Sequence, residues 1–509
     1  MKIVLANPLL KNSINTNLER YYIRSGSRWP HSGIKRKGTL PHYLPFPFSL
    51  AYAAGLLRDN GFDVKVIDAI ALDIGEDNFI DMLQREHPAL VLFETTTPTI
   101  EKDLLLTQKI KKNVKTKIAL CGAHATVFSR ELSEACQDID YILRNEYEYT
   151  LLELAEHLRD GKQPRDVRGI TYMENTTVIF NEDAPLIEPL DILPFPAREL
   201  FPMNEKSNPA IYWDGFCQYR PAIQMHASRG CPYRCYFCLW NQIMYRCGKY
   251  RMFSATRVVD EIEDTIKKYN AKEIYFDDDD FTISKRHVKD ICHEIRKRRL
   301  KIKWSCMGDA INLNDEVLKT MAESGCVGLK FGVESGSPKI VTTIGKPVHL
   351  NRVKEVAKLC AKYGIKSHAT FSIGLLGDDR DSINETIGFA KDLDVDTIQV
   401  SICTPYPGTE FFKRAHELNL IRTTEWEKYD GKVTEVLEPQ NLSWQEIEDL
   451  KTKFLKDWSY TKMTTPSWII RQIKYLLRWI RGIGFIFFLR QLIFVWIDEL
   501  ERRRFEETN

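Results

Sequence analysis

Short apolar runs alternate with stretches of helical periodicity over the first 160 residues of the chain. Five runs are rich in β-branched residues and are predicted as buried strands: 2–5, 63–67, 90–93, 117–121 and 141–143. Between them, residues 49–58, 103–112 and 150–158 have the apolar spacing of helices. This alternation predicts an α/β domain at 1–160 with a doubly wound, Rossmann-like parallel sheet, whose ligands lie at the carboxyl ends of the strands.

A second series of strands and helices follows a proline-rich segment. Residues 161–221 include five prolines between positions 185 and 202 and are predicted as a linker. Six further strands are predicted at 223–228, 273–276, 303–306, 327–332, 366–373 and 397–402. Six such units fall short of the eight in a closed barrel, so residues 222–420 are predicted as a partial (βα)6 barrel. Residues 421–464 are predicted as a helical extension and 465–509 as an amphipathic tail.

The composition is that of a globular protein, since 43% of the 509 residues are hydrophobic and 28% are charged. The 72 Lys and Arg residues nearly balance the 70 Asp and Glu residues, and a net charge of +2 argues against nucleic acid as the partner. The amino-terminal apolar run is too short for a secretory signal, which predicts a cytoplasmic protein. The twelve cysteines are then expected to be reduced thiols or metal ligands.

Three cysteines gather directly after the first predicted strand of the barrel. Cys231, Cys235 and Cys238 lie on one loop at the carboxyl end of that strand, where barrel enzymes carry their chemistry. One short loop can bring three thiolates to a cubane iron-sulfur cluster and leave one iron without a protein ligand. The alternative is a zinc site, but structural zinc usually takes two Cys-x2-Cys pairs. Its fourth ligand would be one of Cys217, His226 and Cys247.

The cysteine motif, with Phe237 before its last member as a further cofactor contact, resembles the signature of the radical S-adenosylmethionine (SAM) superfamily. The resemblance implies a [4Fe-4S] cluster whose open iron binds SAM, cleavage of SAM to a 5′-deoxyadenosyl radical, and reduced flavodoxin or ferredoxin as electron donor. Later strand ends are similar to the SAM-binding segments of the family. They place Asp277 near the SAM amino group, Gly332 and Glu334 near its ribose, and Gly374 near its adenine. Leu376 and Asp378 depart from the commoner pattern, which has Pro and Glu there.

The N-terminal domain resembles that of the cobalamin-binding radical SAM group. The similar segments are 45–57, the turn at 122–126 and the residues at 146–150 before a helix. Small residues at strand ends let a corrin ring or its nucleotide tail approach the backbone. The candidate cobalamin contacts are Asn7, Thr96, Gly122, His124 and Glu146. No Asp-x-His-x-x-Gly string occurs, so base-off binding without an axial histidine is implied, and His124 is alternatively a turn residue without a ligand.

Further strings resemble the branch of this group that contains the anaerobic magnesium-protoporphyrin ester cyclase and the radical SAM protein of hopanoid-biosynthesis clusters. They include residues 144–146, 238–240 and 405–409. The implied activity is methylation, cyclisation or rearrangement of an unactivated carbon with the help of cobalamin, and no general acid or base is assigned. Two alternatives are an enzyme that uses SAM alone beside a vestigial N-terminal domain, and a non-enzymatic iron-sulfur protein. Electron carriers saturate their clusters with four cysteines, which argues against the second alternative.

The segment 468–497 carries five basic residues and no acid. Arg471, Lys474, Arg478 and Arg481 share one helical face, opposite a row of isoleucine and leucine. Its longest uncharged run, 482–489, is too short for a transmembrane span, which needs about 20 apolar residues. We therefore predict a helix in the interface at the inner face of the membrane, its bases on anionic lipid, and a lipid or lipid-linked substrate. The alternative is an amphipathic helix that packs on the barrel.

Overall fold

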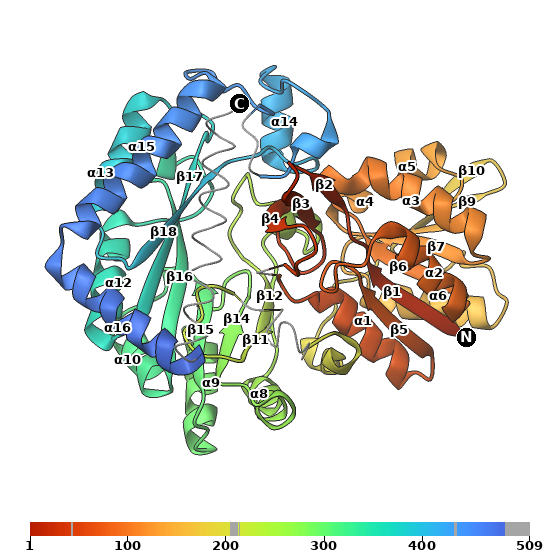
Figure 1. The fold of residues 1–509 in the computed structure, drawn as a ribbon, viewed down its shortest axis with the longest axis horizontal. Helices are drawn as coiled ribbons and strands as arrows, with labels where there is room; N and C mark the ends of the chain where they lie inside the picture. The colour runs from red at the N-terminus through yellow and green to blue at the C-terminus, as the bar shows by residue number, and fades with distance from the viewer. Residues whose placement is uncertain (42–43, 204–211, 213, 432–434, 484–509) are drawn as a thin grey trace.

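Two α/β halves lie side by side in the computed structural model, which describes residues 1–41, 44–203, 212, 214–431 and 435–483 (Figure 1). The N-terminal half is built on a sheet with the order β10-β9-β8-β7-β6-β1-β5. Its parallel strands are β1 (Lys2–Asn7), β5 (Asp63–Asp68), β6 (Leu90–Glu94), β7 (Lys117–Cys121) and β8 (Tyr141–Leu143). The predicted doubly wound, Rossmann-like class is confirmed.

Helices cover both faces of this sheet. Since successive side chains of a strand point to opposite faces, each strand contributes to two apolar cores. Ile3 and Leu5 of β1 belong to one apolar core, and Val4 and Ala6 belong to the other. The first core includes α1 (Phe48–Asp59) and α6 (Glu148–Arg159), which lie next to each other. The second core is covered by α2 (Glu76–Glu86), α3 (Ile100–Asn113), α4 (Ala123–Val127) and α5 (Ser129–Ala135). The short helix η1 (Thr97–Thr99) precedes α3.

A small antiparallel sheet that the sequence analysis did not predict is inserted between β1 and α1. It comprises β2 (Lys11–Ser13), β3 (Leu18–Ile23) and β4 (His31–Arg36). These strands mix charged and apolar residues, so no apolar run marks them. In Figure 1 they lie between the two halves. Asn12 of β2 reaches the C-terminal part of the chain, where its Nδ2 donates to Glu427 Oε1 at 2.7 Å.

The linker is shorter than the predicted 161–221. A hairpin of β9 (Ile170–Glu174) and β10 (Thr177–Phe180) extends the N-terminal sheet beyond β8 in antiparallel fashion. Among the described residues, the proline-rich part that follows contains only the short helices η2 (Leu190–Ile192) and η3 (Arg198–Leu200). The prolines identify this second part in the sequence. The sequence of the two short strands, in contrast, has no feature that distinguishes them from a linker.

Six parallel strands form the second half, in the order β11-β14-β15-β16-β17-β18. They are β11 (Ala222–Met225), β14 (Glu273–Phe276), β15 (Lys303–Gly308), β16 (Cys326–Glu334), β17 (Lys366–Ile373) and β18 (Thr397–Ile402). In the described residues the edge strands β11 and β18 do not pair, so the barrel is partial, as predicted. The predicted first strand ends early, because the chain turns into a ribbon of β12 (Ser228–Gly230) and β13 (Tyr250–Met252).

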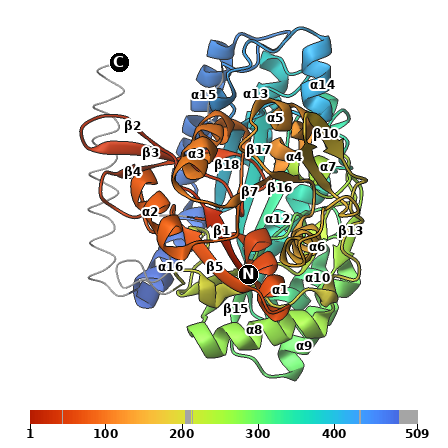
Figure 2. The same cartoon turned by 90° about the vertical axis from the view of Figure 1, so that its right-hand side faces the viewer.

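The outer face of the barrel is covered by helices, and part of its inner face is accessible to solvent. The helices are α8 (Ala255–Tyr269), α9 (Lys285–Lys297), α10 (Asp315–Glu323), α12 (Leu350–Tyr363) and α13 (Arg380–Asp392), with α7 (Leu239–Ile243), α11 (Pro338–Val341) and α14 (Glu410–Glu417) in the loops. Figure 2 shows the N-terminal half in front of these elements. Along β17 the side chains alternate between partly exposed and buried, and Lys366, His368, Thr370 and Ser372 are the partly exposed ones. The partly exposed face is the barrel lumen.

The C-terminal segment is helical only in part. Of the predicted extension at 421–464, the first half holds a bridge between Ile421 and Leu437 and the turn η4 (Trp426–Lys428), and the second half is α15 (Trp444–Met463). The predicted tail begins as α16 (Pro466–Ile483), and its residues 484–509 lie outside the described part of the chain. No helix within the described ranges is long and apolar enough to cross a bilayer.

Candidate active site

The cysteine loop follows β12 and is held by two side chains of α7. Gln242 Nε2 donates to three carbonyl oxygens of the loop at 3.0–3.1 Å. Asn241 Nδ2 donates to a fourth, that of Tyr233, at 2.9 Å. Loop carbonyls thereby obtain partners inside the protein, which fixes the position of the thiols. The sequence analysis missed both residues, because polar positions on a short helix carry no signal of what they bind.

A segment before α12 packs against the same loop. The backbone N–H of Arg234 donates to the carbonyl oxygen of Gly345 at 3.1 Å. Gly345 has a φ of +79°, and a Cβ at this position would lie 2.4 Å from the carbonyl oxygen of Arg234. Only glycine allows this contact. The loop is therefore enclosed between α7 and the segment around Gly345.

The three thiols of the loop are half-buried. Burial raises the pKa of Cys238 to about 11 and also raises the pKa values of Cys231 and Cys235. Without a metal the loop therefore holds thiols rather than thiolates at neutral pH, and binding of the predicted cluster would release their protons.

The acidic run 277–280 at the end of β14 lies against the protein rather than in solvent. Asp278 accepts a hydrogen bond from the hydroxyl of Ser228, and Asp279 Oδ2 accepts one from the backbone N–H of Gly230 at 2.8 Å. Burial raises the pKa of Asp278 to about 7. These carboxyls hold β12, the strand that leads into the cysteine loop.

Asp277, the predicted contact of the SAM amino group, lies beside the β3–β4 connection of the N-terminal half. Arg28 Nη2 donates to Asp277 Oδ1 at 2.9 Å. Burial raises the pKa of the Asp277 carboxyl, and the Arg28 cation opposes that shift. Arg28 is a third residue that the sequence did not predict, because its partner is 249 positions away in the chain.

Gly332 and Glu334 lie at the end of β16, where the register to β17 shifts. Ser372 Oγ donates to Glu334 Oε2 at 3.1 Å, and Lys346 Nζ lies 3.5 Å from Glu334 Oε1 and 2.5 Å from Asp309 Oδ2. A Cβ on Gly332 would lie 2.2 Å from Glu334 Oε1, so a side chain at this position would displace the Glu334 carboxylate. Although burial alone lowers it, Asp309 and Glu334 raise the pKa of Lys346, which stays a cation here.

Gly374 begins a tight turn after β17, with a φ of +76°. The backbone N–H of Leu375 donates to Asp378 Oδ2 at 2.9 Å, so the turn closes although Asp378 departs from the commoner family pattern. The ring of Phe237 is half-buried and packs edge-on against Tyr236, with ring centroids 5.5 Å apart. Phe237 belongs to the cysteine loop itself, and the Gly374 turn borders that loop, since the backbone N–H of Leu376 donates to the Tyr236 hydroxyl at 3.0 Å.

A small cavity lies between the carboxyl edge of the N-terminal sheet and α7. Its walls are the ends of β6 and β7, the β3–β4 connection, and Leu239 and Trp240 of α7. Thr96 lines it, and Gly122 and His124 flank Ala123 of its wall. The structure therefore brings three of the predicted cobalamin contacts together, directly beside the cysteine loop.

The chemistry of this edge fits a large polar cofactor. Thr95 Oγ1 is buried without a hydrogen-bond partner, and Gly122, at a φ of +105°, leaves space that a Cβ would close at 2.4 Å from the Thr95 carbonyl oxygen. His124 Nδ1 lies 3.3 Å from Thr97 Oγ1, and burial lowers the pKa of His124 to about 3, so the ring is neutral. The cavity is small, so we predict that rim side chains such as Trp29 move when a corrinoid binds at this edge.

Asn7 and Glu146, the remaining predicted contacts, have other partners. Asn7 Nδ2 donates to the buried carboxylate of Asp68 at 3.0 Å. The Glu146 carboxylate binds Arg229 and Arg251 of the barrel half at 2.7 Å each. The side chain of Glu146 therefore joins the two halves.

The structure sets a partial barrel with three thiols at a strand end against the ligand edge of a doubly wound domain. This arrangement is typical of enzymes that combine an iron-sulfur cluster with a second large cofactor. Residues 225–390 match the radical SAM superfamily, and residues 41–155 match the B12 binding domain. An uncharacterized methyltransferase of Pyrococcus horikoshii is 33% identical over 410 residues, which cover 80% of this chain and 86% of that protein. The chain belongs to the radical SAM superfamily, in the group that carries a B12-binding domain.

Further relatives confirm the predicted branch. The anaerobic magnesium-protoporphyrin IX monomethyl ester cyclase of Rubrivivax gelatinosus is 26% identical and covers 79% of this chain and 72% of its own. The hopanoid C-3 methylase of Methylococcus capsulatus is 25% identical, with coverages of 72% and 67%. The solved radical SAM methyltransferase TsrM of Kitasatospora setae, with cobalamin and a [4Fe-4S] cluster bound, has a TM-score of 0.63 at 17% identity over 83% of this chain and 79% of that chain, which shows a shared fold.

The protein is therefore a cobalamin-dependent radical SAM enzyme, with a [4Fe-4S] cluster, SAM and cobalamin as cofactors. The match to the B12 binding domain argues against an enzyme that uses SAM alone. The enzymatic relatives argue against a non-enzymatic iron-sulfur protein. The roles of individual residues toward the cofactors stay predictions.

Proposed function

We propose that the enzyme methylates an unactivated carbon of a lipid or lipid-linked substrate while it is docked on the inner face of the membrane. Methyl transfer is supported by relatives that are named methyltransferases and by one named hopanoid C-3 methylase. When bound, the cluster and SAM supply a radical that abstracts hydrogen, and cobalamin carries a methyl group. The chain's own residues bind and orient these groups: Asp277 and Glu334 hold SAM, and the lumen residues of β17 contact the substrate.

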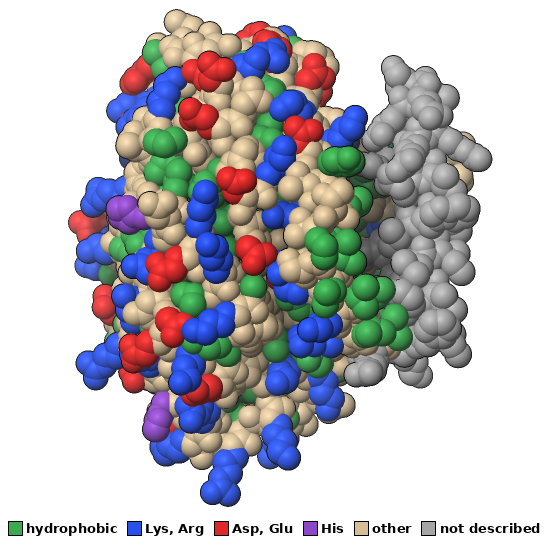
Figure 3. Space-filling view, turned by 90° about the vertical axis from the view of Figure 1, so that its left-hand side faces the viewer, with side chains coloured by type: hydrophobic (Ala, Val, Ile, Leu, Met, Phe, Trp, Pro, Cys, Tyr) green, Lys and Arg blue, Asp and Glu red, His purple; other side chains and the backbone are tan. Residues whose placement is uncertain are grey.

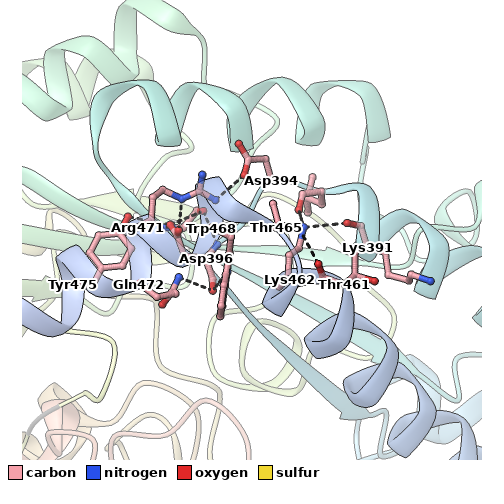
Figure 4. A network of polar contacts seen from close by, with 12 residues as sticks. Lys391, Asp394, Asp396, Thr461, Lys462, Thr465, Trp468, Arg471, Gln472 and Tyr475 are labelled. Atoms are coloured by element: carbon pink, nitrogen blue, oxygen red, sulfur yellow. Dashed lines mark hydrogen bonds and ion pairs between the residues drawn. The ribbon is translucent and has the colours of Figure 1, made fainter.

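The observation that carries the membrane part of the proposal is the orientation of α16. Its polar face is fixed on the barrel (Figure 4). Arg471 Nε donates to Asp396 Oδ1 at 2.7 Å and Arg471 Nη2 donates to Asp394 Oδ1 at 2.6 Å. Trp468 Nε1 donates to the carbonyl oxygen of Asp396 at 2.9 Å, and the Tyr475 hydroxyl donates to its carboxylate at 3.1 Å. The helix is therefore held in one rotation about its own axis.

The apolar face of α16 points outward as a consequence. It comprises Ile469, Ile470, Ile473, Leu476 and Leu477, which are 38–54% exposed. Figure 3, a view of the side that carries α15 and α16, shows hydrophobic side chains gathered together on the surface. Exposed apolar patches of this kind mark contacts with proteins or membranes, and the apolar side of an interfacial helix enters the acyl boundary.

The structure corrects the sequence-based interpretation of the basic face. The prediction that Arg471 contacts lipid is wrong, because the side chain is bonded to Asp394 and Asp396 of the barrel. Lys474 is exposed, whereas Arg478 reaches Gln218 at 3.4 Å. Insertion of the apolar face, with a small electrostatic share, is therefore the mode of docking that we propose.

The docking helix lies at the opposite end of the barrel from the cluster. Asp394 and Asp396 precede β18, at the amino ends of the strands, whereas the cysteine loop lies at the carboxyl ends. The helix therefore anchors the enzyme without forming the mouth of its active site. Loss of docking should slow turnover of a substrate embedded in vesicles, while turnover of the same substrate in detergent stays unchanged.

Vesicle flotation tests the anchoring. The triple variant Ile470→Asp, Ile473→Asp, Leu477→Asp should lower binding to vesicles at least about 100-fold, because each buried apolar side chain contributes about 1.5 kcal/mol or more. Leu105→Asp is the control, since Leu105 belongs to α3, outside the apolar face of α16, and is 56% exposed. Equal binding by the wild type and the triple variant would contradict the membrane proposal.

Product analysis tests the chemistry. The enzyme is reconstituted with iron, sulfide and hydroxocobalamin, then incubated with total lipid extract and SAM that carries a deuterated methyl group. Transfer of the label to one lipid species supports methylation. A product that loses hydrogen and takes no label would show cyclisation instead, and label found only in water-soluble compounds would refute a lipid substrate.

A further inference from the structure

The connection between β3 and β4 contacts both cofactor regions at once. Three of its residues, Ser27, Trp29 and Pro30, line the cavity at the cobalamin-type edge of the N-terminal sheet. Arg28, which lies between Ser27 and Trp29 in the sequence, points in the other direction and binds the barrel. Neighbouring positions of one short loop therefore face two different sites.

Arg28 holds the end of β14 at three points. Its Nη2 donates to Asp277 Oδ1 at 2.9 Å, its Nη1 donates to the carbonyl oxygen of Asp277 at 2.8 Å, and Nη1 also donates to the carbonyl oxygen of Asp278. The side chains of Arg28 and Asp277 are only 18% and 13% exposed. A planar guanidinium that binds a carboxylate and the backbone together fixes both the position and the orientation of that carboxylate.

The loop itself has little freedom to move independently. The carbonyl oxygen of Pro30 accepts a hydrogen bond from the buried Tyr406 hydroxyl at 3.1 Å. At the other end, Gly26 has a φ of +85°, and a Cβ there would lie 2.3 Å from the carbonyl oxygen of Phe46. Arg28 therefore lies in a segment that is anchored on both sides and that also forms part of the cavity wall.

We propose that Arg28 is a positioning residue that couples the two cofactor sites, so that a corrinoid bound against Ser27, Trp29 and Pro30 holds Arg28 and Asp277 in the geometry that binds SAM. The inference rests on the predicted contact of Asp277 with the SAM amino group and on cobalamin binding at the N-terminal edge. Because coupling between two binding sites is reciprocal, SAM raises the affinity for the corrinoid by the same factor.

The test measures SAM affinity in anaerobic protein with an intact cluster, with and without saturating hydroxocobalamin. We expect the wild type to bind SAM about tenfold more tightly when the corrinoid is present, within the usual range of coupling between sites. In Arg28→Gln the ratio of the two affinities should fall to about one, and Arg28→Lys should restore only part of it, because an ammonium cannot bind all three acceptors in one plane.

Two further variants separate coupling from a structural role. Trp29→Ala, on the cavity side of the loop, should reduce the ratio of the two affinities to about one. Arg20→Gln is the control, since Arg20 is a half-exposed cation on β3 that faces Asp430 rather than the cofactor sites, and it should keep the full ratio.

Several outcomes overturn the proposal. If Arg28→Gln weakens SAM binding by the same factor with and without corrinoid, Arg28 positions Asp277 without coupling the sites. If Arg28→Gln and Trp29→Ala both keep the tenfold ratio, the loop has no part in it. A wild type that takes up SAM but no corrinoid overturns cobalamin binding at this edge together with the coupling, and intact corrinoid uptake with a ratio of one overturns the coupling alone.

Discussion

Glu94, at the end of β6, is the titratable side chain in the wall of the cavity. Burial, with a smaller contribution from Glu148, raises its pKa from the usual 4.5 to about 7. Between pH 4.5 and 7, the Glu94 carboxyl is therefore protonated in the folded protein, whereas it is already ionised in the unfolded chain. The free energy of unfolding falls across that window and is lower by about 3 kcal/mol above it.

Glu94→Gln should accordingly raise the melting temperature at pH 8 by a few degrees and change it little at pH 5. Thermal unfolding of the metal-free protein at both pH values measures the effect. An equal gain at the two pH values would show that the amide stabilises the fold through hydrogen bonds and that ionisation of Glu94 costs nothing.

Gly122 decides whether the N-terminal edge admits a corrinoid. Gly122→Val places a branched side chain against the Thr95 carbonyl, and we expect it to lower corrinoid uptake at least about tenfold while cluster content is unchanged, because the backbone can no longer be approached closely. Absorbance of bound corrinoid per cluster is the measurement. Gly61→Val is the matched control, since Gly61 also has a positive φ but has open space around its Cβ position. Equal uptake by both variants would remove Gly122 from the site.

Cys247 allows the cluster to be distinguished from a four-ligand zinc site. Cys235→Ala should abolish bound iron and sulfide and the formation of 5′-deoxyadenosine, because the cubane loses one of its three protein ligands. Cys247→Ala should keep both, although Cys247 is a half-exposed thiol only nine positions beyond Cys238. Loss of the metal in Cys247→Ala would point to a fourth cysteine ligand.

At the level of elements, Arg471 forms ion pairs between α16 and the barrel through Asp394 and Asp396. Arg471→Gln leaves the buried carboxylate of Asp396 without its cation, which should cost about 1–3 kcal/mol because Arg471 itself is partly exposed. Since α16 lies at the periphery, the loss should appear as local opening. Limited proteolysis between α15 and α16 measures it. Lys474→Gln removes the same charge from an exposed position of the same helix and should have no effect; equal cleavage of both variants would contradict the role of Arg471.

Elements whose burial is visible in the local pattern of apolar residues were predictable from the sequence. Elements that depend on partners far along the chain were not. Strands β14, β17 and β18 have the predicted bounds, because β14 is a short buried run and β17 and β18 alternate polar and apolar residues with the period of a strand. β3 was missed, because its sequence LERYYI keeps two charges that find partners in other elements. In the site, the cysteines and Gly122 follow from local motifs. Gln242 and Arg28 could not be predicted, because their partners are backbone carbonyl oxygens that only the fold brings next to them.

At the scale of the whole molecule, the two halves are joined by buried charges. Glu146 and Glu148 of the N-terminal half face Arg229 and Arg251 of the barrel half at 2.7–2.8 Å, and all four side chains are at most 5% exposed. Although burial alone raises it, Arg229 and Arg251 lower the pKa of Glu146. Such a group is stable only when every charge keeps its partner.

Glu146→Gln should therefore destabilise the protein by about 3–5 kcal/mol, because two buried guanidiniums lose part of their counter-charge. Chemical unfolding followed by intrinsic fluorescence measures the change. Glu153→Gln, at an exposed position of α6, is the control and should be neutral. A stability change below about 1 kcal/mol in Glu146→Gln would show that water compensates the arginines and that the ion group does not hold the halves together.

The same ion group limits how domains can be exchanged between relatives. A hybrid that joins this N-terminal half to the barrel of another family member brings two buried carboxylates to the junction, and it folds only if the foreign barrel supplies cations at the places of Arg229 and Arg251. If the two halves are produced as separate chains, complementary charge on their faces should speed their association at low ionic strength. The charges at the junction, rather than the fold of either half, would then determine which pairs of relatives give a stable hybrid.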